Sequence, residues 1–428
     1  MISIFVGLLV ALIMLGIAIP YALGGTSVVI MMIESGIANF PFGLIPQRMV
    51  SGVNSFTLLA IPFFLLAGKL MNRGSISRKI FDFANYVVGW IPGGLAHANI
   101  FASLVHAGQS GSAVSDVVAL GPIQIKAMKR AGFRTDFSCA VSATSALVSP
   151  LTPPSIPLIV FGVAGSVSIN RLFMAGVFPG LLLTGVLMLT VIIMSARRNY
   201  PRTSFPGWRI FLKAWWEALL PSFTVVILMG GIITGIFTAT EAAAVASLYA
   251  FILTVIIYRE VPLRDLLGIF KEVAKETAAI MLIVAAASIY GFLVIRTQLP
   301  IVLMNAMLGV TENPIMILVL INIFLLIFGL FMETNSAIII LTPVVLPIVT
   351  AFGVNPVHFG VVMVFNLLIG LVTPPVGMLL FVTCRVGQLP FNRMLRATAP
   401  FYIPLIILLF ILTFVPQISL WLPNRIFG

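Results

Sequence analysis

Long apolar runs separated by short polar segments recur along the whole chain. Each run is close to the ~20 residues with which an α-helix crosses the hydrocarbon core of a bilayer. The pattern therefore predicts an all-α polytopic membrane protein. The runs that fit full crossings cover residues 2–23, 26–45, 53–70, 137–165, 171–194, 219–238, 241–258, 278–296, 356–383 and 398–421.

Two further segments, 94–130 and 314–350, each contain two apolar legs that are short for a full crossing. The legs of the first meet at the polar sequence GQSGSA, and those of the second meet at METNSA. Short legs around a polar tip are typical of a re-entrant hairpin, whose irregular backbone must be buried in protein at membrane depth. We expect one such hairpin in each half of the chain.

Each half then holds five crossings and one hairpin. Because five is odd, the second half enters the membrane in the opposite direction, which predicts an inverted repeat. Short sequence matches support the duplication. TPP occurs at 152–154 and 373–375, offset by 221 residues, and SA occurs at 112–113 and 336–337, offset by 224.

Two charged stretches, 75–90 and 263–276, carry Leu, Ile, Phe and Val at helical spacing. Such amphipathic patterns predict helices that lie in the membrane interface. They are either arms that link fixed and moving parts or ordinary surface loops with helical order. The loop 197–217 combines Arg, Lys and Trp, as expected of an interfacial linker between the halves.

The composition excludes a soluble globular domain, because 60% of the residues are hydrophobic and 8% are charged. The net charge of +12 follows the positive-inside rule when the segment RRNYPR (197–202) faces the cytoplasm. The N-terminus is then periplasmic, and no nucleic-acid partner is expected. The basic residues that fall on the outer side are Arg48, Arg171, Arg296 and Arg425.

A Pro-Pro pair stands inside each of the runs 137–165 and 356–383. Proline lacks an N–H group and clashes with the preceding turn, so each pair frees backbone carbonyls that lipid cannot satisfy. With the hydroxyls of Thr152 and Thr373, these carbonyls are uncharged oxygen ligands that suit a weakly bound monovalent cation such as Na⁺. A lone proline is usually a kink, but two TPP motifs at matching places favour two ion sites.

Small polar residues at the hairpin tips offer hydroxyls and exposed backbone for the same two sites. They are Gly108, Ser110, Gly111 and Ser112 in the first tip and Thr334, Asn335 and Ser336 in the second. Two broken helices that meet two tips would form pseudo-equivalent cation sites on either side of one substrate. The N-termini of the half-helices would then point at a bound anion.

Over essentially its whole length the chain resembles the large membrane subunit of TRAP (tripartite ATP-independent periplasmic) transporters. The resemblance is carried by SGVNSFTLLAIPFFLLAGKLMNRG (51–74), GQSGSAVSDVVALGPIQIKAMKRAGF (108–133), PLTPPSIPLIVFGVAGSVSINRLFMAGVFPGLL (150–182), GIFTATEAAAVASLYA (235–250), ETNSAIIILTPVVLPI (333–348) and HFGVVMVFNLLIGLVTPPVG (358–377). It implies a Na⁺-coupled, elevator-type importer of an organic acid anion such as sialic acid or a C4-dicarboxylate, in the bacterial inner membrane. A small four-helix membrane subunit and a periplasmic substrate-binding protein are the implied partners, and no cofactor besides the coupling ion is implied.

The resemblance also divides the chain into fixed and moving parts. The implied parts are scaffold helices at 1–70 and 219–258, interfacial arms at 71–93 and 259–277, a linker at 195–218, and transport-domain halves at 94–194 and 278–428. The implied cation ligands are Ser110, Gly111, Ser112, Thr152 and Pro153 in one site and Thr334, Asn335, Ser336, Gly370 and Thr373 in the other. Pro154 and Pro374, beside these ligands, are candidates for contact with the substrate.

Three further polar residues are substrate candidates with plainer alternatives. Gln109 and Arg385 depart from the family's usual pattern, so both are candidates for substrate contact. Arg385 either attracts a carboxylate or is an interfacial arginine of the positive-inside set. Asp116, one turn beyond the first tip, either tunes a cation site and holds the tip or forms an ion pair with Lys126.

Other polar residues are expected to have mainly structural roles. Glu333 is positioned to cap the returning helix of the second hairpin. Thr238 and Glu241 have the spacing of a capping box. His106 lies three residues before Gln109 and is either a packing histidine or a group in binding or proton coupling.

Three rival functions stand beside a three-part importer, and the first of them remains open. A stand-alone Na⁺- or H⁺-coupled symporter of carboxylates or oxyanions would have similar hairpins and repeats. An integral-membrane enzyme is disfavoured because the sequence contains no HExxH motif, no Ser/His/Asp grouping and no clustered carboxylates. A channel is also disfavoured, since nothing resembles a selectivity-filter ring.

Overall fold

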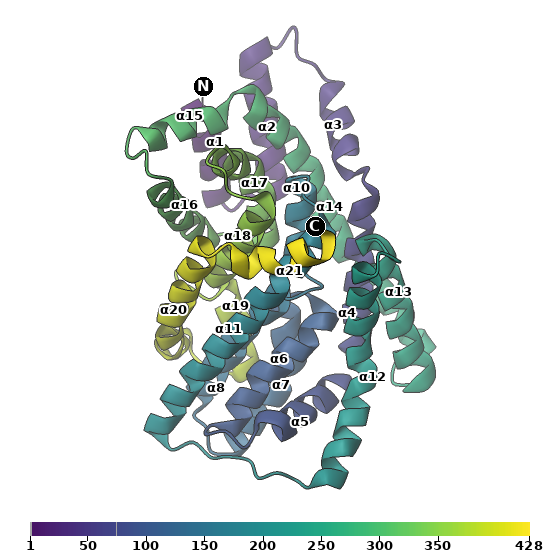
Figure 1. Cartoon of the computed structure of the whole chain (residues 1–428). Coiled ribbons are helices and arrows are strands. Elements are labelled where there is room, and N and C mark those ends of the chain that lie inside the picture. The colour runs from purple at the N-terminus through teal and green to yellow at the C-terminus, as the bar shows by residue number, and fades with distance from the viewer. Residues whose placement is uncertain (1, 74) are drawn as a thin grey trace.

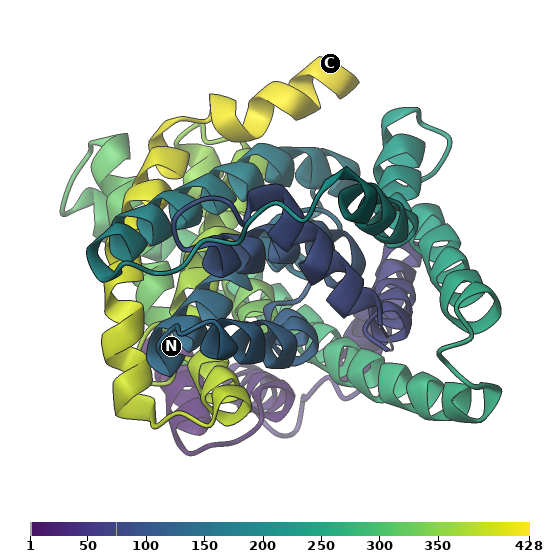
Figure 2. The ribbon, with the colours of Figure 1, turned by 90° about the horizontal axis from the view of Figure 1, so that it is seen from below.

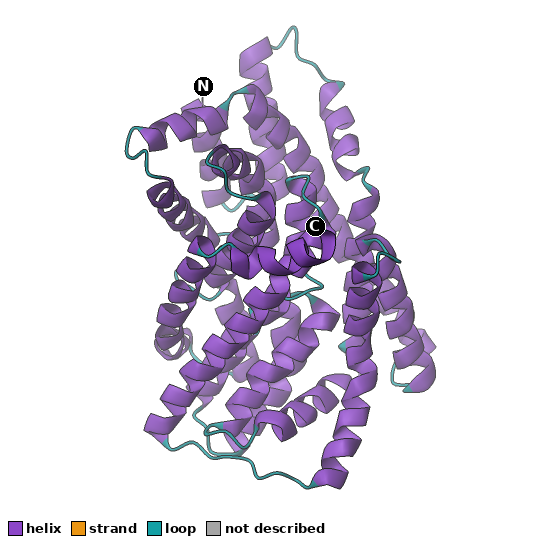
Figure 3. Cartoon of the chain, viewed as in Figure 1, coloured by secondary structure: helices purple, strands orange, loops and turns teal. Residues whose placement is uncertain are grey.

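Helices form all the regular structure in the part of the chain that the computed structural model describes, residues 2–73 and 75–428 (Figure 3). Met1 and Gly74, which fall in the predicted ranges 1–70 and 71–93, lie outside the described residues. The prediction of an all-α protein is confirmed for the residues described.

The helices of the first half are α1 (Ile2–Met14), α2 (Ile19–Ser35), α3 (Leu44–Val53), the 3₁₀-helix η1 (Phe56–Leu59), α4 (Ala60–Met71), α5 (Ile76–Val88), α6 (Gly94–Ser110), α7 (Ala113–Arg130), α8 (Thr135–Ser145), α9 (Val148–Leu151), α10 (Ile156–Ala164) and α11 (Ile169–Arg198). Those of the second half are α12 (Trp208–Ile233), α13 (Ala239–Phe251), the π-helix η2 (Ile252–Ile257), α14 (Leu263–Arg296), α15 (Leu299–Leu308), α16 (Pro314–Gly329), α17 (Thr334–Ala351), α18 (Pro356–Leu371), α19 (Met378–Gly387), α20 (Phe391–Phe414) and α21 (Gln417–Phe427).

Among the described residues, six helices are long and apolar enough to cross a membrane, or up to eight if each bent pair counts as one span. The six are α11, α12, α13 with η2, α14, α17 and α20. The bent pairs are α3 with η1 and α4, at 57°, and α8 and α9 with α10, at 45°. The predicted crossing at 171–194 lies within α11, and the one at 241–258 lies within α13 and η2 except for its last residue. The one at 219–238 is shifted, because α12 begins eleven residues earlier and ends five residues earlier.

Both predicted hairpins are pairs of packed helices, but the expectation that every leg is short for a crossing is wrong for α17, whose 18 residues are long and apolar enough to span. The first is α6 with α7 and the second is α16 with α17. Figure 1 shows the first pair in the lower half of the molecule and the second pair in the upper half. The amphipathic helix α5 lies near the lower end and confirms the helix predicted at 75–90.

Both predicted helix breaks are present at the TPP motifs. The first broken helix ends α9 at Leu151 and resumes as α10 at Ile156. The second ends α18 at Leu371 and resumes as α19 at Met378. The Pro-Pro peptide bonds within both breaks are cis.

Two N-terminal helix boundaries were predicted wrongly. The run 2–23 is not one helix, because α1 ends at Met14 and α2 begins at Ile19. Gly16 has φ +79° in the turn, a conformation that glycine adopts without strain, and Pro20 favours the start of the new helix. The predicted crossing 26–45 is consequently replaced by the end of α2, a loop and the start of α3.

Three boundaries in the second half also differ from prediction. The stretch 263–276 is not a separate interfacial helix but the beginning of α14, which continues through 278–296 for 34 residues, or about 51 Å. Strong helix formers fill its middle, and no Gly or Pro interrupts residues 269–290. The run 398–421 is divided into α20 and α21 at Val415 and Pro416, and the short helix α15 was not predicted.

The segment between α11 and α12 joins the two halves. Figures 1 and 2 both show residues 199–207 running along one end of the molecule. The predicted linker 195–218 is therefore coil only in its middle, because α11 extends to Arg198 and α12 begins at Trp208.

Helix α14 connects the N-terminal helices to the hairpin region. It packs against α2, α3 and α4 on one side and against α17 on the other. Helix α4 in turn packs against α13 and α6. The hairpins and broken helices pack among themselves through α7 with α19, α10 with α17 and α16 with α18, so that α4 and α14 form a wall beside them.

Candidate functional site

The tip of the first hairpin lies directly against the first helix break. Ser110 Oγ is 3.1 Å from Ser149 Oγ, in the last helical turn before the break. Gly111 follows at φ +55°, and a Cβ atom at this position would lie 2.5 Å from Pro154 O. Glycine is therefore needed both for the left-handed conformation and for the close approach of the two backbones.

Helices α7 and α10 each begin with a capping serine at this junction. Ser112 Oγ accepts from the Ser115 amide, and Ser155 Oγ accepts from the Leu158 amide at 3.2 Å. Thr152 lies in the extended segment, and its Oγ1 atom is buried without a hydrogen-bond partner among the described residues. This hydroxyl lies against Gly180 of α11, where a Cβ atom would approach it to 2.2 Å, and it does not line the cavity described below.

The second hairpin also contacts the second break through glycine. A Cβ atom on Gly370, in the last turn of α18, would lie 2.3 Å from Gly329 O at the end of α16. Thr373 Oγ1 donates to Ile369 O at 2.7 Å, which leaves its oxygen lone pairs free to accept. In the first half the tip itself meets the break, whereas in the second half the contact joins the helix ends that precede the tip and the break.

Glu333 caps the returning helix of the second hairpin, as predicted. Its carboxylate accepts from the Ser336 amide at 3.0 Å and from Asn335 Nδ2 at 2.8 Å. Thr334 Oγ1 and Asn335 Oδ1 are buried and have no hydrogen-bond partner in the described part of the chain. The capping box of Thr238 and Glu241, at the start of α13, is also confirmed.

Both tips and the helix ends that flank both breaks border one cavity of about 380 Å³, whereas the break residues 152–155 and 372–377 do not line it. Among the predicted residues, those that line it are Gly111, Ser112, Thr334, Asn335 and Ser336. Leu65 of α4 and a face of α14 that includes Glu276 and Ile280 close the other side. We call this space the central cavity.

Four helices begin at the wall of the central cavity. Their first residues, which all line it, are Ala113 of α7, Ile156 of α10, Thr334 of α17 and Met378 of α19. The N-terminus of a helix carries a partial positive charge, which favours an anion. Ser112, Ser155 and Glu333 already cap three of these ends, so the partial charge and not free N–H groups is what they offer. The carboxylates of Glu276 and Glu333 also line the cavity and oppose this attraction.

A second cavity of about 630 Å³ adjoins the central one. The two share Leu65, Ser112, Val114 and Glu276. The second cavity lies between α4, α7 and α14 and carries four charged side chains. They are Lys69, Arg73, Glu272 and Glu276.

Most of these charged residues were missed as site residues. The charges of 263–276 were interpreted as those of an interfacial helix, whereas α14 brings Glu272 and Glu276 to a cavity wall. Lys69 contacts both carboxylates, at 3.5 Å for Glu272. The local sequence AGKLMN (67–72) marks Lys69 as a charged residue near the end of an apolar run, but nothing in it indicates a cavity.

Asp116 holds the first hairpin together and does not pair with Lys126. Its side chain is 1% exposed, and Oδ2 accepts from Ser103 of α6 at 2.7 Å. His106 Nε2 is 3.9 Å from Asp116 Oδ1. Lys126, by contrast, is exposed and lies farther along α7. The ion-pair alternative is therefore wrong for the described conformation.

The remaining substrate candidates do not line either cavity. Gln109 is buried near the first tip, with both amide atoms unpartnered among the described residues. Arg385 is exposed in the last turn of α19, as expected of an interfacial arginine. Pro154 and Pro374 lie within the breaks, set back from the cavity lining.

Comparisons with known proteins match this architecture along nearly the whole chain. The large permease SiaM of a sialic acid TRAP transporter from Vibrio cholerae is 43% identical over 382 residues, 89% of this chain and 90% of the relative. The 2,3-diketo-L-gulonate TRAP large permease YiaN of Escherichia coli is 36% identical over 419 residues, 97% of each chain. The C4-dicarboxylate TRAP large permease DctM of Pseudomonas aeruginosa is 40% identical over 369 residues, 86% of each.

A solved structure shows the same fold. The YdaH transporter of Alcanivorax borkumensis superposes with a TM-score of 0.63 at 12% identity, over 89% of this chain and 87% of that one. The family model of the DctM component of tripartite ATP-independent periplasmic transporters matches residues 6–418. With that match and three relatives above 30% identity, the chain belongs to the family of large permease components of TRAP transporters, a family of multi-pass membrane transporters and not of enzymes.

Proposed function

We propose that this chain is the translocating subunit of a Na⁺-coupled importer of an organic acid anion in the bacterial inner membrane. The observation that carries the proposal is the convergence of four helix N-termini on the central cavity. These ends stabilise negative charge without a fixed cation, so a bound anion can still leave. Relatives are named for sialic acid, 2,3-diketo-L-gulonate and C4-dicarboxylates, all of which are acids.

Na⁺ would bind where each hairpin tip meets a helix break. The unpartnered oxygens Thr152 Oγ1, Thr334 Oγ1 and Asn335 Oδ1 lie in these segments, beside backbone carbonyls that the prolines free. Neutral oxygen ligands of this kind suit a hard monovalent cation. A cation on either side of the central cavity would add to the attraction for the anion.

An elevator mechanism is supported by the way in which the cavity walls divide. One wall consists of the hairpins and broken helices, which pack among themselves, and the other consists of α4 and α14. This division places residues 278–296 of α14 in the fixed wall and not in the moving half 278–428 that the resemblance implies. Movement of the first wall past the second would carry the anion across the membrane. The opposite placement of the two hairpins in Figure 1 supports the inverted repeat that such a movement uses.

The cytoplasmic end is assigned to the linker between α11 and α12, which carries Arg197 and Arg198 at its start. This orientation makes the N-terminus periplasmic. A periplasmic substrate-binding protein would deliver the anion, and a small four-helix membrane subunit would complete the transporter, as the tripartite family implies.

The test is uptake by proteoliposomes that contain this chain with the membrane subunit and binding protein encoded beside it. A panel of sialic acid, 2,3-diketo-L-gulonate and C4-dicarboxylates would be measured with Na⁺ and again with K⁺ in its place. Uptake of one acid that requires both Na⁺ and the binding protein is expected. Uptake by the chain alone would instead favour a stand-alone symporter.

A further inference from the structure

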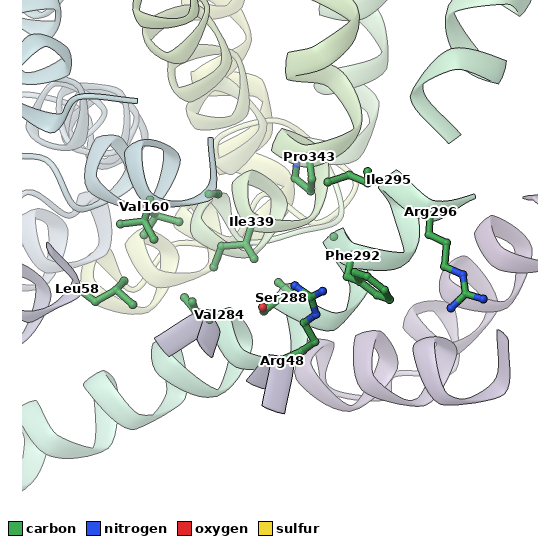
Figure 4. A pocket seen from close by; sticks show the side chains of 15 residues that line it. Arg48, Leu58, Val160, Val284, Ser288, Phe292, Ile295, Arg296, Ile339 and Pro343 are labelled. Carbon is green, nitrogen blue, oxygen red and sulfur yellow. The ribbon is translucent and has the colours of Figure 1, made fainter. Parts of the chain in front are cut away.

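A separate cavity of about 450 Å³ lies between α3 and α14 on one side and α10 and α17 on the other (Figure 4). It shares no lining residue with the central cavity. We call it the lateral cavity. Its volume is in the range that holds a small organic ligand.

Apolar side chains form most of the lateral cavity. Val160 and Val163 of α10, Ile339 and Pro343 of α17, and Leu58 of η1 contribute to the wall. The polar groups at the lining are Arg48 of α3 with Ser288 and Arg296 of α14. A ligand here must therefore be mainly hydrocarbon.

Arg48 carries a positive charge that no acidic side chain at the cavity lining balances. Its guanidinium lies 4.2 Å from the ring centroid of Phe292 and forms no ion pair within the described residues. Figure 4 shows it at the centre of the lining residues, beside Ser288. Arg296, in contrast, has an acidic partner. Its side chain points away from the other lining residues in Figure 4, and its Nε atom lies 3.4 Å from Glu34 Oε2 of α2.

This arrangement selects an amphipathic anion over a hydrophilic one. A polyhydroxylated acid would leave most of its hydroxyls without partners, since Ser288 offers the one hydroxyl at the lining. A hydrocarbon chain against the valine and isoleucine wall has no such cost. One guanidinium matches one phosphate or carboxylate group.

We propose that the lateral cavity binds an acidic phospholipid, whose phosphate contacts Arg48 and Ser288 and whose acyl chain lies against α10 and α17. A protein that spans a bilayer is surrounded by such lipids, and the positive charge of Arg48 favours a headgroup without a cationic amine over a zwitterionic one. If the elevator movement proposed above occurs, the lipid bridges its fixed and moving parts and so controls their separation.

The binding test uses the full chain purified in a neutral detergent and native mass spectrometry with phosphatidylglycerol, phosphatidylcholine or sialic acid. Both lipids offer a phosphate, but the choline ammonium of phosphatidylcholine would place a second positive charge near Arg48, so one phosphatidylglycerol should bind about tenfold more tightly. Arg48→Gln should remove that preference. Arg171→Gln, which changes an outer-side arginine away from this cavity, should keep it.

A second variant tests the acyl chain. A Cβ atom on Gly291 has its nearest neighbour, Pro343 Cβ, at 3.7 Å, so Gly291→Leu fills the cavity without a backbone clash. It should reduce retention of both lipids, while size-exclusion profiles check folding. Equal binding of the two lipids by the wild-type chain, equal losses in Arg48→Gln and Arg171→Gln, or displacement of lipid by sialic acid would each overturn the proposal. None of these readouts depends on transport, so the proposed function can fail independently.

Discussion

Ser110 Oγ lies 3.1 Å from Ser149 Oγ and joins the tip of the first hairpin to the last turn of the helix that breaks beside it. One residue farther along, Gly111 approaches Pro154 so closely that a side chain has no space. The tip and the break therefore form one rigid unit, and small changes at their contact should alter the proposed cation site.

Gly111→Ala should destabilise the first tip and weaken the response to Na⁺. The left-handed conformation costs a non-glycine residue about 1–2 kcal/mol, and the new Cβ would lie 2.5 Å from Pro154 O. Thermal unfolding in detergent, with and without Na⁺, measures both effects. Gly185→Ala is the matched control, because that glycine has no atom within 4 Å of its Cβ position. Equal changes in the two variants would contradict a special role for the tip.

Thr152→Val should separate Na⁺ binding from stability. The hydroxyl has no protein partner, so its removal should leave the unfolding temperature without Na⁺ unchanged or raised. Valine is also compatible with the extended backbone at this position. The half-saturating Na⁺ concentration should rise by about fivefold to tenfold if one ligand is lost.

Thr184→Val is the control for that experiment. The Thr184 hydroxyl donates to Gly180 O within α11 and lines neither cavity. Its loss should leave the Na⁺ response intact. An unchanged Na⁺ dependence in Thr152→Val would remove the first break from the cation site.

Ser103→Ala should destabilise the hairpin, because it deprives the buried Asp116 carboxylate of its one short hydrogen bond. Leaving a buried acceptor without its donor lowers the free energy of unfolding by about 1–3 kcal/mol. In the Asp116→Asn background, Ser103→Ala should lower the free energy of unfolding by less, since no carboxylate remains to lose its donor. Reversible unfolding in mixed micelles gives the coupling energy of the double-mutant cycle. Additive losses would show that the contact is not a stabilising one.

Local signals made the hairpins and breaks predictable, but not the helix ends or the cavity wall. Polar tips and Pro-Pro pairs act within a few residues, so GQSGSA and TPP indicated their structures directly. The turn at Gly16 lies inside an unbroken apolar run, where hydropathy gives no boundary. Glu276 looked interfacial because its neighbours are charged, and only the packing of α14 against the tips places it at the cavity.

Lys69→Gln should weaken transport of the anion through the adjoining cavity. Lys69 and Arg73 together balance Glu272 and Glu276 there, and removal of Lys69 leaves one uncompensated negative charge on a wall that the proposed solute passes. These side chains are partly exposed, so the effect should be modest, about twofold to fivefold in the half-saturating solute concentration. Uptake assays at low and high ionic strength measure it, and the loss should shrink as salt screens the charges.

Two further variants test whether the loss of uptake comes from the charges on this cavity wall. Replacing both glutamates as well, in Lys69→Gln/Glu272→Gln/Glu276→Gln, should restore the uptake, because both carboxylates are gone and Arg73 is the one charged side chain left on the wall. Arg385→Gln removes a positive charge that lies outside both cavities and should have no effect. If Arg385→Gln lowers uptake as much as Lys69→Gln does, general surface charge and not the cavity wall explains the loss. If the triple variant is no better than Lys69→Gln, the lysine acts through its own contact with the solute.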